Sequence, residues 1–190
     1  FLHVGVVSEL LRQGLLPRVI SGSSAGSIVA AALAAYTDEE MKELDLVGMM
    51  GSDDDGSKSV LWQWVSGMGS RLTAEDTEKL IAATIPDLTF AEAYAKTGRQ
   101  VSITVAPAEP HQRSRLLNAV SSPNVYLRSA AMASCAIPGV FPAVMLQAKN
   151  ELGEAQPYLP ARRWVDGSVA DDLPAKRLSR LFSTNHYIVS

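Results

Sequence analysis

Cysteine and histidine are scarce in this chain. Its 190 residues include one cysteine and three histidines. The single Cys135 excludes an intrachain disulfide and is typical of a protein kept in a reducing compartment inside the cell. It lies in an apolar helical pattern, so we predict that it packs in the core. Any reaction that needs an imidazole base must use His3, His111 or His186.

Long apolar runs and an excess of one charge are also absent. No segment approaches the roughly 18 apolar residues of a membrane-spanning helix, because Arg, Ser and Pro interrupt every candidate. The net charge is −3, and no basic cluster indicates a nucleic-acid partner. With 47% apolar and 19% charged residues, the composition is that of a globular protein. We expect one domain over residues 1–190, without a metal or another cofactor.

The most informative segment is the one around Ser24. An apolar strand leads through Gly22-Ser23-Ser24-Ala25-Gly26 into an alanine-rich helix. Gly22 and Gly26 remove side chains that would collide where strand and helix converge, so the turn can leave Ser24 exposed at its apex. A hydroxyl there can attack a carbonyl, and the Ala25 N–H can hold the resulting oxyanion. The alternative is a plain turn whose serines cap the helix.

A nucleophilic serine needs a general base, and the residues alone leave several candidates. Asp166 ends a short apolar segment and precedes Gly167, and the sites of open α/β sheets assemble at such strand ends. An ordinary Asp-Gly turn is the alternative. The order Ser24, Asp166, His186 also matches the chain order of α/β-hydrolase triads.

Three stretches resemble the patatin-like phospholipase family. They are Leu15–Ser27, which contains the serine motif, Tyr126–Pro142, and Val165–Pro174, which contains Asp166-Gly167-Ser168. The first and last are similar to the triacylglycerol-lipase branch in particular. The resemblance covers nearly the whole chain and is weakest over residues 36–89.

This resemblance implies a hydrolase with a Ser–Asp dyad in place of a triad. Ser24 would be the nucleophile and Asp166 the general base of ester hydrolysis through an acyl-serine. The motif residues that would shape the turns and the oxyanion site are Gly22, Ala25, Gly26, Gly167 and Ser168. The implied substrate is a lipid, triacylglycerol before phospholipid. The implied location is intracellular, either cytoplasmic or in peripheral contact with a membrane or lipid droplet.

A carboxylate in water is a weak base at neutral pH, so such a dyad requires a partly desolvated Asp166. We expect Trp164 and Val165 to exclude water from it. Asp171 and Asp172 lie nearby but lack the Asp-Gly context. The acyl chain is expected to lie against three apolar residues, Ile137, Val140 and Phe141.

The glycine-rich oxyanion loop of the family has no counterpart here. The chain begins at Phe1, inside the expected first helix, and ends on an expected strand at 186–190. We therefore interpret it as the interior of a longer protein, truncated at both ends. Loss of one oxyanion donor typically costs about 100- to 1,000-fold in rate, so the piece is expected to be slower than its parent. A lysolipid acyltransferase and a non-catalytic lipid-binding relative stay open as alternatives.

Helices and strands alternate along the chain, which predicts an α/β fold. The resemblance makes this a patatin-like three-layer sandwich, with a mostly parallel central sheet and helices on both faces. Strands are expected at 18–21, 101–105, 116–120, 141–146, near Asp166 and at 187–189. Helices are expected before Gly14, at 28–36, after Thr37, at 73–85, at 89–98 and at 126–135, and a loop at 149–162.

Two features between residues 51 and 69 have other interpretations. The acidic stretch 53–56 lacks the alternating oxygen ligands of a calcium loop, so we predict a solvated loop. Trp62 and Trp64 are predicted to pack in the core, with a flap that contacts lipid as the alternative.

Overall fold

A four-stranded sheet organises the computed structural model, which describes residues 2–43, 73–109, 111–168 and 173–189. Strand β2 (Gln100–Pro107) is its centre, and β1 (Val19–Gly22) pairs with it in parallel. Strands β3 (Arg115–Leu117) and β6 (Trp164–Asp166) run antiparallel to β2, so the sheet is mixed. A separate hairpin joins β4 (Gln147–Lys149) to β5 (Ala155–Pro157).

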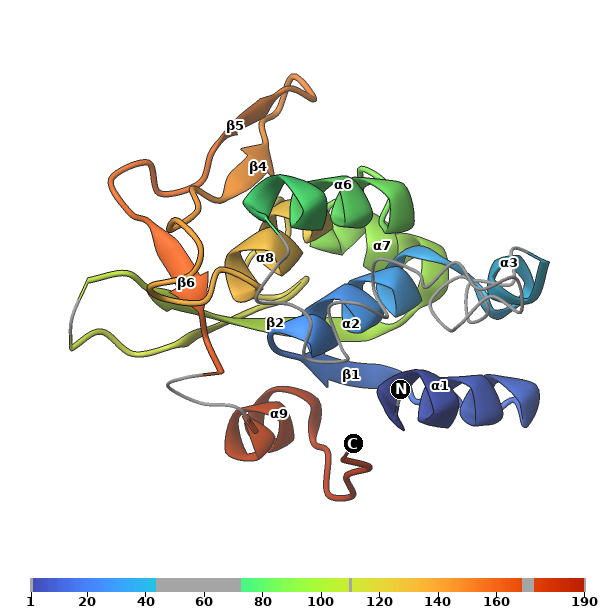
Figure 1. The fold of residues 1–190 in the computed structure, drawn as a ribbon. Helices are drawn as coiled ribbons and strands as arrows, with labels where there is room; N and C mark the ends of the chain where they lie inside the picture. The colour runs from blue at the N-terminus through green and yellow to red at the C-terminus, as the bar shows by residue number, and fades with distance from the viewer. Residues whose placement is uncertain (1, 44–72, 110, 169–172, 190) are drawn as a thin grey trace.

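Helices cover both faces of this sheet (Figure 1). On one face lie α2 (Ala25–Ala35), α6 (Ala74–Thr84), α7 (Phe90–Thr97) and α8 (Leu127–Ser134). On the other side lie α1 (Leu2–Arg12) and α9 (Ala175–Phe182), while α3 (Asp38–Glu43) follows α2 at the edge. The predicted α/β class, with helices on both faces, is confirmed. None of the described helices is long and apolar enough to cross a membrane.

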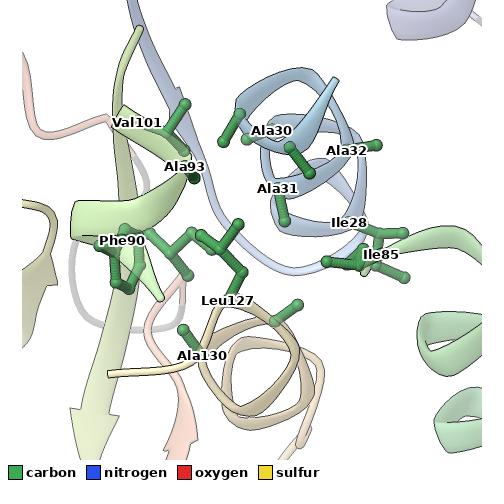
Figure 2. Packing of buried hydrophobic residues seen from close by; sticks show 14 of the residues in the cluster. Ile28, Ala30, Ala31, Ala32, Ile85, Phe90, Ala93, Val101, Leu127 and Ala130 are labelled. Atoms are coloured by element: carbon green, nitrogen blue, oxygen red, sulfur yellow. The ribbon is translucent and has the colours of Figure 1, made fainter. Parts of the chain in front are cut away.

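The core is centred on α2. Every residue of this helix from Ser27 to Ala35 is buried, and most of them are alanines, which are the best helix formers. Their small side chains let neighbouring elements approach closely. Figure 2 shows α2 facing side chains of α7, α8 and β2, among them Phe90, Leu127 and Val101.

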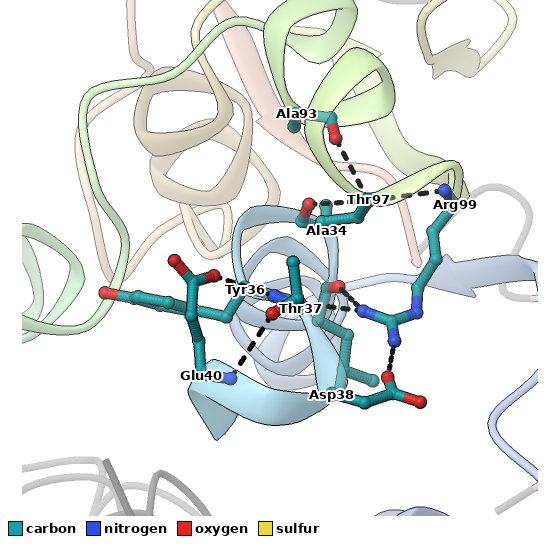
Figure 3. A network of polar contacts seen from close by, with 9 residues as sticks. Ala34, Tyr36, Thr37, Asp38, Glu40, Ala93, Thr97 and Arg99 are labelled. Carbon is teal, nitrogen blue, oxygen red and sulfur yellow. Dashed lines mark hydrogen bonds and ion pairs between the residues drawn. The ribbon is translucent and has the colours of Figure 1, made fainter. Parts of the chain in front are cut away.

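Buried polar contacts close the far end of α2. Arg99 donates to the carbonyls of Leu33 and Tyr36, 2.8 Å in each case, and forms an ion pair with Asp38 (Figure 3). Thr97 donates to the Ala34 carbonyl at 3.1 Å. These donors satisfy carbonyls that a helix end leaves without a partner. The opposite end of the same helix begins next to Ser24.

The capping signals of the sequence mark real helix starts. Thr89 and Glu92 form a reciprocal capping box at the start of α7, and Thr73 and Asp76 form one at α6. Helix α7 then ends at Gly98, whose φ of 68° lies in the left-handed region. The helices predicted from these signals are confirmed.

Several predicted strands are shifted or wrong. Residues 141–146 form no strand, only an isolated bridge from Val144 to Trp164, because Pro142 cannot donate to a ladder. The strand expected at 116–120 ends at Leu117, since the Asn118 side chain accepts from the Val120 and Ser121 N–H groups and turns the chain.

The last third of the chain holds elements that we did not predict. The expected loop 149–162 contains β5, whose sequence Ala-Gln-Pro has little strand character. Helix α9 was missed as well, although Leu178, Leu181 and Phe182 follow helical spacing. The strand expected at 187–189 is absent from the described residues, where Ile188 and Val189 are exposed. The acidic stretch 53–56, Trp62 and Trp64 lie outside the described residues.

Candidate active site

Ser24 lies between β1 and α2 in a backbone conformation that few residues adopt. Its φ is 50° and its ψ is −129°. A non-glycine residue held in such a region costs about 1–3 kcal/mol, and strain of this kind clusters at functional sites. Within the described structure the Ser24 side chain makes no capping hydrogen bond, so the helix-cap alternative does not hold for it.

Gly22 lets the strand and the helix meet. A Cβ on Gly22 would lie 2.3 Å from the Gly26 carbonyl oxygen and 2.9 Å from the Ala30 Cβ. A Cβ on Gly26 would meet no heavy atom within 4 Å among the described residues. A side chain at Gly22 would therefore collide with α2, as predicted. The prediction that a side chain at Gly26 would also collide is wrong.

We expect Gly22→Ala to destabilise the fold by about 1–3 kcal/mol or more, because β1 and α2 would have to separate. Gly26→Ala is the matched control, and it should be neutral or stabilise by up to about 1 kcal/mol, because alanine favours a helix. Urea unfolding of both variants measures the difference. Equal stability of the two would contradict the close approach at Gly22.

Hydrogen bonds hold the Ser24 backbone on both sides of its Cα. Its N–H donates to the Ser134 Oγ at 3.0 Å. Its carbonyl accepts from the Ser27 Oγ at 2.6 Å and from the Cys135 thiol at 3.4 Å. Ala25 and Gly26 follow in the first turn of α2, where backbone N–H groups have no partner within the helix. The positive end of the helix dipole therefore lies beside Ser24.

Asp166 ends β6 and is buried, with 2% of its surface exposed. Its N–H donates to the Ala136 carbonyl at 2.9 Å, and its Oδ1 accepts from the Ser168 N–H at 2.9 Å. A Cβ on Gly167 would lie 2.7 Å from backbone atoms of Thr104 and Val105. Gly167 thus allows the turn after Asp166 to lie directly against β2.

Strand register brings the two motifs to one place. Gly22 pairs with Ile103 and Asp166 pairs with Val105, while β3 pairs with both of these β2 residues. Since β3 occupies one edge of β2, β1 and β6 share the other edge. Partners two residues apart along a strand are separated by about 7 Å. The turn that follows Gly22 and the end of β6 therefore lie next to each other.

Cys135 lies between these two motifs. Its thiol contacts the Ser24 carbonyl, and it is 2% exposed. Burial is the largest of the causes that bring the pKa of this thiol to about 12; a hydrogen bond with Ser27 opposes the rise, and the negative charge of Asp166 adds to it. The thiol is therefore neutral at physiological pH and is a poor nucleophile, as expected for a core cysteine.

The other predicted residues lie in different settings. Ile137 and Val140 are exposed and Phe141 is half-buried, on a turn directly after Cys135. His111 and His186 are exposed; the side chain of His3, and Asp171 and Asp172, lie outside the described part of the structure. No group of three His, Cys, Asp or Glu side chains in the described residues is arranged to hold a metal ion.

Sequence reasoning missed the residues that surround Ser24. Ser134 and Ser27 were treated as parts of helices, yet both are fully buried and hydrogen-bonded to the Ser24 peptide. The Ser134 contact joins residues 110 positions apart, so no local pattern could reveal it. Ser27 does carry a signal, because a serine three residues into a helix can bond the cap carbonyl.

Comparison with known proteins gives consistent matches over the chain. The family model for patatin-like phospholipase matches residues 1–178. Triacylglycerol lipase 4 of Saccharomyces cerevisiae is 42% identical over 200 residues, which cover 98% of this chain and 22% of that protein. Triacylglycerol lipase 5 of the same yeast is 38% identical, covering 98% of this chain and 27% of that protein. A patatin-like phospholipase domain-containing protein of Pyricularia oryzae is 37% identical over all of this chain and 24% of its own length.

The chain spans about a quarter of the length of these relatives. Among solved structures, VipD from Legionella pneumophila matches with a TM-score of 0.49 and 14% identity, over 90% of this chain and 44% of that one.

Proposed function

The chain belongs to the patatin-like phospholipase family, and from that premise we propose that it hydrolyses lipid esters with Ser24 as nucleophile and Asp166 as general base. The observation that supports this most strongly is the shared edge of β2, which brings the strained Ser24 turn beside the buried carboxylate. Relatives named as triacylglycerol lipases favour triacylglycerol as the substrate, with phospholipid second.

In the first half-reaction the Asp166 carboxylate takes the Ser24 proton as Oγ attacks the ester carbonyl. The Ala25 N–H donates to the oxyanion of the tetrahedral intermediate. The intermediate collapses to an acyl-serine, and the leaving alcohol takes the proton from Asp166. Asp166 then takes a proton from water as the water attacks the acyl-serine, and it returns this proton to the Ser24 Oγ as the bond from Oγ to the acyl carbon breaks and the fatty acid leaves. One oxygen of Asp166 accepts from Ser168, and we assign the proton transfers to the other.

Asp166 is held in one position, as this role requires. It is buried, with 2% of its surface exposed, and hydrogen bonds hold both its backbone N–H and its Oδ1. The exposed Ile137 and Val140 follow closely after Cys135, and we propose that they contact the acyl chain or the lipid surface from which it is drawn. Peripheral contact with a membrane or lipid droplet is part of the same proposal.

Release of fatty acid in three incubations tests the reaction class. Wild-type chain and Ser24→Ala are incubated with emulsified triacylglycerol, with phosphatidylcholine vesicles, and with triacylglycerol as acyl donor together with lysophospholipid as acyl acceptor. We expect Ser24-dependent fatty acid from triacylglycerol above that from phospholipid. Acyl transfer to the lysophospholipid in place of fatty-acid release would identify a transferase. Binding to vesicles without turnover by folded chain would identify a lipid-binding relative.

We expect His186→Ala to keep the rate of hydrolysis within about twofold of wild type. His186 is exposed, and its Nδ1 lies 2.8 Å from the side chain of its neighbour Asn185. A dyad has no use for this imidazole, whereas loss of a triad histidine typically costs at least about 1,000-fold. Steady-state kinetics of the variant decide between the two.

A further inference from the structure

One buried hydroxyl, that of Ser134, links the Ser24 turn to the central strand. Ser134 ends α8 and is fully buried. Its Oγ accepts the Ser24 N–H at 3.0 Å and donates to the Thr104 carbonyl at 2.8 Å. A serine hydroxyl has one proton, so donation to Thr104 leaves its lone pairs to accept from Ser24. The two bonds therefore have a fixed direction, from the turn through the hydroxyl to β2.

The position of Thr104 gives this link its significance. Thr104 lies in β2 between Ile103, the partner of Gly22, and Val105, the partner of Asp166. The Ser134 hydroxyl therefore connects the Ser24 N–H to the β2 residue that lies between the pairing positions of β1 and β6. These two strands lead to Ser24 and to Asp166. In the next peptide group, Ser27 holds the Ser24 carbonyl.

We propose that Ser134 is a positioning residue for the hydrolysis. Its hydroxyl holds the Ser24 peptide in its strained conformation and sets the distance from Ser24 to Asp166, and it touches neither the substrate nor the reacting atoms. It also occupies the Ser24 N–H, which leaves the N–H of Ala25 as the oxyanion donor of this turn. This inference rests on the proposed function of Ser24 and Asp166, and it adds a residue that sets their geometry.

Ser134→Ala would leave the Ser24 N–H and the Thr104 carbonyl without this partner, so the strained turn can relax. A displacement of about 1 Å at a reacting group can cost about 100-fold in rate. We expect kcat and the rate constant of fluorophosphonate labelling to fall about 10- to 100-fold, with KM within about threefold. KM should hold because Ser134 contacts no substrate.

The matched control is Ser102→Ala. Ser102 is also fully buried, but it lies in β2 and its hydroxyl accepts from the Asn118 side chain at 3.4 Å. Four proteins are compared: wild type, Ser134→Ala, Ser134→Thr and Ser102→Ala. For each we measure fluorophosphonate labelling per folded molecule and hydrolysis of the soluble ester p-nitrophenyl butyrate. We expect Ser102→Ala to label at the wild-type rate and Ser134→Thr, which keeps the hydroxyl, to recover most of the loss. Equal rates for Ser134→Ala and Ser102→Ala would overturn the inference while leaving the proposed function intact.

Amide hydrogen exchange at Ser24 provides a readout that does not depend on activity. In Ser134→Ala, exchange of this amide should be at least about tenfold faster than in wild type or in Ser102→Ala. If Ser134→Ala does not fold, wild type and Ser134→Thr carry the test, and an unprotected Ser24 amide in wild type overturns the inference. If the folded wild type exchanges slowly at Ser24 yet does not label, the proposed function has failed, and the positioning role fails with it.

Discussion

Replacing Ser24 by alanine is expected to end labelling by a fluorophosphonate and to lower ester hydrolysis by at least about 10,000-fold. Loss of the nucleophile removes the covalent step, and in serine hydrolases it typically costs up to about 10⁶-fold in kcat. Labelling followed by gel fluorescence, together with fatty-acid release, measures both effects. Undiminished labelling of Ser24→Ala would move the nucleophile to another serine, and Ser23 is the nearest along the chain.

The stability of Ser24 variants separates loss of chemistry from loss of fold. The Ser24 side chain makes no capping bond in the described structure, so alanine should change the free energy of unfolding by less than about 0.5 kcal/mol. Glycine at this position tolerates the φ of 50° and should relieve strain, although it adds entropy to the unfolded chain. We therefore expect Ser24→Gly to be inactive and more stable by up to about 1 kcal/mol.

The parts of the site that the sequence revealed are those with short-range causes. A strand, Gly22 and an alanine-rich helix define the turn at Ser24, because each acts on its own neighbours. The Asp166-Gly167 pair is equally local. Placement of these two turns on one edge of β2 required the pairing register, which a single sequence does not contain.

The wrongly predicted elements also have physical reasons, which are particular residues and contacts with other strands. Residues 141–146 have the apolar composition of a strand, but Pro142 and the packing around Val144 leave only a single bridge. Strand β5 forms because β4 offers it a partner, although its own residues do not favour an extended conformation. Ser134 acts through a tertiary contact, and nothing in its sequence neighbourhood distinguishes it from other buried serines.

Asp166→Asn is expected to lower kcat and the labelling rate by about 1,000- to 10,000-fold. Asparagine has the same shape, and its Oδ1 can still accept the Ser168 N–H, so the turn should persist while the base is lost. Loss of a triad aspartate in this way typically costs about 10,000-fold. Asp38→Asn is the matched control, because Asp38 forms an ion pair with Arg99 at the far end of α2 and should affect stability alone.

Cys135 reports whether the Asp166→Asn variant keeps its fold. The charge of Asp166 raises the pKa of this thiol, so removing that charge must lower the pKa and increase the thiolate fraction at any given pH. Burial is the larger cause and remains in the variant, so alkylation of Cys135 by iodoacetamide should quicken only slightly. Slow fluorophosphonate labelling, together with only a small increase in the alkylation rate of Cys135, means that a base was lost from an intact site. Fast alkylation of Cys135 means that the core has opened. Fluorophosphonate labelling of the variant at the wild-type rate means that Asp166 is not the base, and His186 is then the next candidate to be tested.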